Sequence, residues 1–145
     1  MNNRLSICVW MSILIFVGSV SLDGQTKSWR SYFNEAETLK QEGQYLTAAR
    51  KYQQAAEVKP SNKELSYFAG KYFVIGRDYA RAVACLEPIK DKSNQYPKVL
   101  YYYGLAEKAL GNYEKALEAF TVFHADYNGG DQQQMRGFVA NEIMR

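Results

Sequence analysis

The sequence has few of the residues on which catalytic and metal sites depend. Among its 145 residues there is one histidine, His124, and there are two cysteines. A single histidine excludes a multi-histidine metal site and leaves any histidine-based triad with one candidate, which lies late in an expected helix. Gly129-Gly130 is not followed by the lysine of a phosphate-binding loop. We therefore expect no catalytic residues, no metal and no cofactor, and a protein that is not an enzyme.

The sequence also lacks a block of charge of one sign. It has 18 Lys and Arg against 15 Asp and Glu, a formal net charge of +3, and the two signs alternate along the chain. A nucleic-acid interface needs clustered Lys and Arg, so we expect no nucleic-acid partner. The 47% apolar content is enough to build a core, and the length suits one compact domain.

The first residues differ in character from the rest. Arg4 precedes an almost uncharged apolar run from Leu5 to Val20, and the small residues Ser19 and Ser21 follow. This order predicts a signal peptide over residues 1–24, cut between Ser21 and Gln25, and hence an exported, periplasmic protein that can associate with the outer membrane. The membrane is then contacted only through the transient signal. An uncleaved anchor helix is the alternative, although the run is shorter than the ~20 residues of a membrane span.

Cleavage of this segment would leave one thiol in the chain. Cys8 lies inside the predicted signal, so Cys85 would remain without a partner for an intramolecular disulfide. Residues 5–8 faintly resemble a lipobox, but no apolar segment precedes Cys8, and lipidation there is the less favoured reading.

An internal period of 34 residues runs through most of the chain. The units cover residues 29–62, 63–96 and 97–130 without insertions, within a predicted domain 25–130. Their eighth and twentieth positions are small, and their seventeenth and twenty-fourth are bulky. In that order the residues are Ala36, Gly70 and Gly104; Ala48, Ala82 and Ala116; Tyr45, Tyr79 and Tyr113; Tyr52, Leu86 and Phe120. Such a period indicates one supersecondary unit stacked repeatedly.

Each unit divides into two amphipathic segments, so the sequence predicts an all-α fold. In residues 45–58, for example, apolar side chains recur at steps of three and four. Pro88 interrupts the second segment of the middle unit, and we expect the helix to stop near Glu87 and a looser connector to follow. Residues 131–145 form an expected capping helix that covers the third unit. Its apolar stripe is Met135, Phe138, Val139 and Ile143.

Residues 29–130 resemble the tetratricopeptide repeat family in these positions, most closely in the segment GLAEKALGNYEKA at 104–116. Glu107, where the family often has an aromatic residue, and Gly76, one place early, depart from its pattern. The resemblance implies a right-handed α-solenoid of three helix pairs plus the capping helix. Residues 101–143 also resemble the N-terminal repeat region of bacterial periplasmic proteins of the PorE type. That likeness implies an envelope or type IX secretion assembly.

The resemblance further implies which side chains line the concave groove of the solenoid. The fifth position of each unit is groove-facing, and it is aromatic three times, as Phe33, Tyr67 and Tyr101. We expect these rings to form a partner-binding ladder. Its basic rim would be Arg30, Lys71, Lys98 and Lys108. Such a surface suits a protein or peptide with acidic and apolar side chains. The alternative is that some of the rings only pack between helices.

The sequence thus predicts an exported, periplasmic scaffold or adaptor that binds another protein through its concave groove, as a monomer or as a component of a hetero-complex. A second hypothesis stays open. The chain would then be a structural spacer, or the N-terminal fragment of a larger envelope protein similar to outer membrane protein A, without binding activity in the groove.

Overall fold

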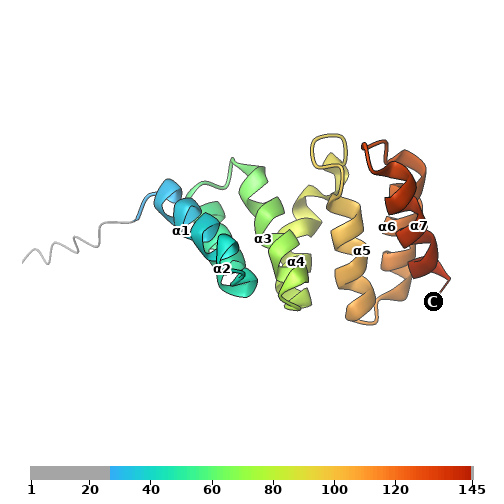
Figure 1. Ribbon diagram of the computed structural model, residues 1–145, viewed down its shortest axis with the longest axis horizontal. Coiled ribbons are helices and arrows are strands. Elements are labelled where there is room, and N and C mark those ends of the chain that lie inside the picture. Colours follow the sequence, from blue (N-terminus) through green and yellow to red (C-terminus); the bar gives the residue numbers. More distant parts are fainter. Residues whose placement is uncertain (1–26, 145) are drawn as a thin grey trace, which may run out of the picture.

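The computed structural model describes residues 27–144, and this part of the chain is helical without strands, as the all-α prediction requires. The predicted signal peptide lies outside the described residues. Figure 1 shows the helices standing side by side in a row along the long axis. They are α1 (Trp29–Gln41), α2 (Tyr45–Val58), α3 (Lys63–Ile75), α4 (Tyr79–Leu86), the 3-10 helix η1 (Glu87–Lys92), α5 (Val99–Ala109), α6 (Tyr113–Asp126) and α7 (Gln132–Ile143). Within residues 27–144, none of these helices combines the length and apolar character that a membrane crossing requires.

The helices follow the sequence repeat. The second helix of each pair begins at Tyr45, Tyr79 and Tyr113, which keeps the 34-residue spacing, and each helix packs against the next in the chain. Small residues at the eighth position of each unit allow the two helices of a pair to pack closely. A Cβ atom on Gly70 would lie 2.4 Å from Cγ of Leu86, and one on Gly104 would lie 2.6 Å from Cε1 of Phe120. The pattern of small residues therefore reflects a real approach of one helix to its partner.

The turns inside the pairs explain the early glycine of the middle unit. Gly43 and Gly111 adopt φ angles of 76° and 82°, and the equivalent residue of the middle unit, Arg77, adopts 62°. A left-handed backbone is unfavourable for a residue with a Cβ. Glycine stands at position 76 instead, where a Cβ would lie 3.1 Å from Cβ of Leu46 on α2. A side chain at position 76 would therefore crowd Leu46 on α2, and Arg77 carries the turn.

The middle pair is shortened where Pro88 predicts it. The α-helix α4 ends at Leu86, and Pro88 occupies the first turn of η1. The segment that follows is more ordered than a loose connector, because residues 87–92 continue as 3-10 helix and Ile89 is only 1% exposed. The buried Ile89 side chain anchors η1 to the core, so the expectation of a loose connector holds only after Lys92.

The capping helix α7 buries a narrower stripe than the sequence suggests. Met135 and Val139 are buried, but Phe138 is 49% exposed and Ile143 is 39% exposed. The expectation that all four side chains are covered is therefore wrong for Phe138 and Ile143. At 3.6 residues per turn these two lie at opposite edges of the stripe, and α7 packs mainly against the single helix α6, which covers only its centre.

Candidate protein-binding face

The three predicted ladder residues come from three neighbouring helices. Phe33 lies on α1, Tyr67 on α3 and Tyr101 on α5, and each is partly buried. The ring centre of Phe33 lies 5.8 Å from that of Tyr52 and 6.4 Å from that of Phe68. One side of Phe33 is therefore committed to packing between the first pair and α3.

Tyr67 has the most ring contacts of the three. Its ring centre lies 5.3 Å from Tyr96, 5.9 Å from Phe68 and 6.2 Å from Tyr102. Burial raises the pKa of Tyr67 to about 12, so its hydroxyl stays protonated at neutral pH. Tyr101 contacts Tyr102 at 5.4 Å. The ring of Tyr67 is thus a partly covered, neutral surface in the middle of the row.

No two of the ladder rings stack on each other directly within residues 27–144; aromatic rings at the sixth position of the second and third units join them. Within residues 27–144, the recorded ring contacts run from Phe33 through Phe68 to Tyr67, and from Tyr67 through Tyr102 to Tyr101. We call the rings of Phe33, Phe68, Tyr67, Tyr102 and Tyr101, together with Tyr72, the aromatic face. Sequence reasoning missed Phe68, Tyr72 and Tyr102. The recurrence of an aromatic at the sixth position of the second and third units was the signal for two of them.

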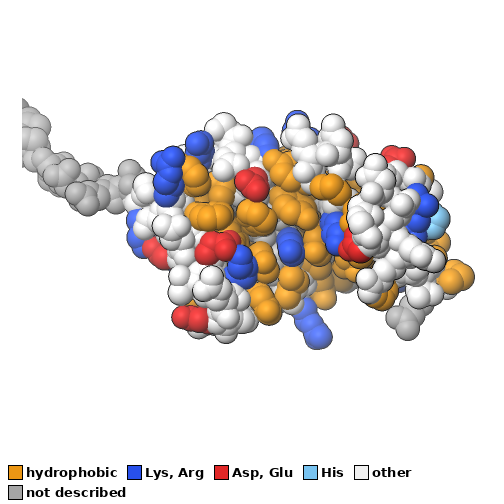
Figure 2. Space-filling model, turned by 45° about the horizontal axis from the view of Figure 1, so that its top comes forward, with side chains coloured by type: hydrophobic (Ala, Val, Ile, Leu, Met, Phe, Trp, Pro, Cys, Tyr) orange, Lys and Arg blue, Asp and Glu red, His pale blue; other side chains and the backbone are white. Residues whose placement is uncertain are grey.

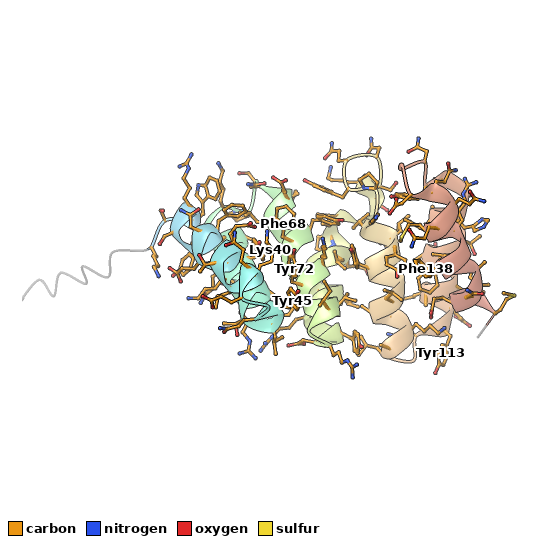
Figure 3. The ribbon with its side chains drawn as sticks, in the orientation of Figure 1. Lys40, Tyr45, Phe68, Tyr72, Tyr113 and Phe138 are labelled. Carbon is orange, nitrogen blue, oxygen red and sulfur yellow. The ribbon has the colours of Figure 1, made fainter. Side chains whose placement is uncertain are left out.

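The views of the molecule agree with this grouping. Figure 2 shows hydrophobic side chains gathered over the middle of one face, with scattered Lys, Arg, Asp and Glu side chains among and around them. In Figure 3, Phe68, Tyr72 and Lys40 lie together between the first helix pair and α3, whereas Tyr113 and Phe138 lie near the C-terminal helices. Apolar side chains with isolated charges of both signs therefore characterise the centre of this face.

Two residues of the predicted basic rim are paired with the capping helix. Lys98 donates to Oδ2 of Asp131 at the start of α7. Lys108 lies 2.9 Å from Oε2 of Glu142 and 2.8 Å from the Glu142 carbonyl oxygen, near the end of α7. A cation at a helix C-terminus also interacts favourably with the helix dipole. These two lysines hold α7 at both ends, which leaves less of their charge for a partner.

The other two rim residues are not bound to carboxylates in the described part of the chain. Arg30 is exposed, and its guanidinium lies 4.6 Å from the ring centre of Trp29. Lys71 is partly buried near the middle of α3, with Nζ 5.2 Å from the ring centre of Tyr72 and 6.0 Å from that of Tyr102. Burial lowers the pKa of Lys71. The structure therefore brings only Lys71 of the four onto the aromatic face without a compensating anion.

The acidic side chain of α1 beside this face, Glu37, is already engaged. The carboxylate of Glu37 on α1 accepts hydrogen bonds from the buried Tyr52 hydroxyl and from Lys40. Glu37 thus fixes Tyr52 and holds Lys40. A partner that contacts this face meets rings and ammonium groups rather than a free carboxylate from α1.

Cys85 is the free thiol of the described residues, and it lies on α4. Burial raises the pKa of the half-buried Cys85 thiol to about 11, which keeps it protonated at neutral pH. No group of three His, Cys, Asp or Glu side chains able to hold a metal ion occurs between residues 27 and 144. The geometry of the aromatic face, partly exposed rings around a lysine, suits contact with another chain.

A scan against the models of known protein families returns no match to this chain, and neither does a search of curated proteins.

Proposed function

We propose that this chain is an exported, periplasmic scaffold or adaptor of the tetratricopeptide type, which binds another protein or peptide through its aromatic face. In this proposal the three helix pairs form a right-handed solenoid, α7 caps it, and the face lies on the concave side. The setting is the bacterial envelope, with type IX secretion as the assembly that the PorE-type resemblance suggests. The protein acts by binding and not by catalysis.

The observation that carries the proposal is the continuous set of rings from Phe33 to Tyr101. Aromatic residues at the centre of an interface commonly contribute most of its binding energy. These rings are held by their neighbours, with centroid distances between 5.4 Å and 6.4 Å along the chain of contacts, and remain partly exposed. Rings fixed in this way lose little side-chain entropy when a partner binds.

Substitution of Tyr67 tests the proposal at the middle of the face. Loss of a central ring is expected to weaken binding by about tenfold or more, because such residues contribute ~2 kcal/mol. The Tyr67→Ala variant and wild type would be titrated calorimetrically with the envelope protein that co-purifies with the chain. Tyr113→Ala is the matched control, since Tyr113 is 68% exposed on α6 and lies far from the labelled rings of the aromatic face in Figure 3.

The same titration separates binding from the spacer hypothesis. If Tyr67→Ala and Tyr113→Ala bind as wild type does, with unchanged helicity by circular dichroism, the aromatic face is not the binding site. The chain would then bind through its convex face. Otherwise it would be a spacer, or the N-terminal fragment of a larger envelope protein similar to outer membrane protein A, without binding activity in the groove.

Export is tested independently of binding. The order of Arg4, the apolar run and the small residues predicts cleavage between Ser21 and Gln25. Intact-mass measurement of the protein from the periplasmic fraction should give a chain that begins in this interval. A mature protein that retains Trp10 would contradict the cleaved-signal prediction and favour an anchor helix.

A further inference from the structure

Lys71 differs from the other lysines around the aromatic face in its electrostatic surroundings. Lys40 is paired with Glu37, Lys98 with Asp131 and Lys108 with Glu142. For Lys71, no Asp or Glu oxygen of residues 27–144 lies within the 4.0 Å of an ion pair.

The groups that act on Lys71 disfavour its charge. Burial lowers its pKa, and the positive charges of Lys98 and Lys40 lower it further. A partly desolvated ammonium that faces like charges is unfavourable unless an anion or ring compensates it. The rings of Tyr72 and Tyr102 supply part of this compensation through cation–π contact. A carboxylate would supply the rest.

Aromatic surface extends from Lys71 in both directions. Toward the N-terminal pair, the ring of Tyr72 stacks on the exposed Tyr45 at 5.9 Å and is supported by the buried Tyr52 at 5.6 Å. Toward the C-terminal helices, Tyr102 contacts Tyr67 and Tyr101. An anion above Lys71 would therefore have apolar surface on either side of it. A partner segment that continues past its acidic residue in both directions fills this surface, whereas one that ends there leaves half of it uncovered.

We infer that Lys71 anchors a single Asp or Glu side chain within a partner segment whose residues on both sides are apolar or aromatic. The carboxylate accepts a charge-assisted hydrogen bond from Nζ of Lys71, and the flanking side chains pack on the rings beside it. This inference rests on the proposed function, because it takes the aromatic face as the binding surface.

The test uses short random peptides displayed on phage and selected on the purified protein. Selected peptides should carry one internal Asp or Glu with apolar or aromatic neighbours on both sides. The tightest peptide, and its counterpart with the acid replaced by the amide, are then titrated into wild type and Lys71→Met, which keeps the apolar stem. The amide peptide should bind wild type about tenfold more weakly than the acidic peptide does, as expected for the loss of a charge-assisted hydrogen bond. The two peptides should bind Lys71→Met with the same affinity.

Lys63→Met is the matched control, because Lys63 is an exposed lysine at the start of the same helix. It should leave the acid-to-amide difference unchanged. If that difference persists in Lys71→Met, or if selection yields peptides without an internal acid, the inference is overturned. If the selected peptides nevertheless bind Tyr67→Ala more weakly than wild type, the proposed function stands and only the role of Lys71 fails. Should no selected peptide depend on Tyr67, both fail.

Discussion

Replacement of Gly104 by alanine tests whether the close approach of α5 and α6 sets the geometry of the third pair. Gly104 is buried on α5, and an added Cβ would lie 2.6 Å, 2.7 Å and 3.0 Å from three carbons of the Phe120 ring. That ring is 1% exposed. The added methyl must therefore displace a helix or force the ring from its rotamer.

Two opposing effects determine the size of the change. Alanine is favoured over glycine inside a helix by about 1 kcal/mol. Overpacking of a well-packed core costs about 1 to 3 kcal/mol, and the short distances to a fully buried ring place this site in the upper part of that range. We therefore expect Gly104→Ala to lower the free energy of unfolding by about 1 to 2 kcal/mol. At roughly 3 to 6 °C per kcal/mol, the thermal midpoint should fall measurably.

Gly137 provides the matched control for this prediction. It lies inside α7, and nothing stands within 4 Å of the position that its Cβ would occupy. Gly137→Ala should therefore show the helix-propensity gain alone, up to about 1 kcal/mol. Urea unfolding followed by circular dichroism measures both variants. If Gly104→Ala is as stable as Gly137→Ala, the two helices do not approach as closely as the structure indicates.

A second substitution locates the cause of the loss. Phe120→Leu removes the ring atoms that the new methyl group would meet, at a cost of its own. In that background, Gly104→Ala should be neutral or stabilising, because the clash is gone and the propensity gain remains. Strong coupling between the two changes is expected for residues in direct contact. Additive effects would show that the cost of Gly104→Ala arises elsewhere.

Three further predictions follow from local features. Arg77→Gly should raise the free energy of unfolding by about 0.5 to 1 kcal/mol in urea melts, because glycine adopts the left-handed φ of 62° without strain. The greater entropy of glycine in the unfolded chain offsets part of this gain. A lower free energy of unfolding in the variant would contradict the prediction. Two lysines beside Glu35 hold its pKa at about 2, below its unfolded value near 4.5. Wild type should therefore be more stable than Glu35→Gln at neutral pH, and this difference in the free energy of unfolding should vanish as pH falls from about 4.5 to about 2. A pH-independent difference would refute the ion-pair origin. Val139→Ala should lower the free energy of unfolding by about 2 kcal/mol and Phe138→Ala by no more than about 1 kcal/mol, because Val139 is buried and Phe138 is 49% exposed. Thermal melts can distinguish the two variants. Equal losses of stability would mean that α7 packs by another face.

The sequence by itself determined where the helices lie and how they pair. The starts of α2, α4 and α6, the early end of α4 and the small residues at Gly70 and Gly104 all follow from local periodicity, proline chemistry and repeated spacing. It also placed Phe33, Tyr67 and Tyr101 on α1, α3 and α5. These features depend on residues close together in the chain or on a repeat visible in the letters, so no knowledge of the stacking was needed.

Only the tertiary structure decided which of those side chains meet. Phe68 and Tyr102 join the ladder rings because adjacent pairs bring the sixth position of one unit beside the fifth of another. The charges of Lys98 and Lys108 are paired because α7 lies within their reach.

Glu107 illustrates the same limit. It is buried at 1% exposure, where its Oε2 accepts a 2.6 Å hydrogen bond from Nδ2 of Asn112, although its spacing marks only a departure from the repeat. Burial and ion pairing depend on distances between helices that are far apart in the chain. A pattern within one helix therefore cannot fix them, and Lys71 was distinguished from the other basic residues only once its neighbours were known.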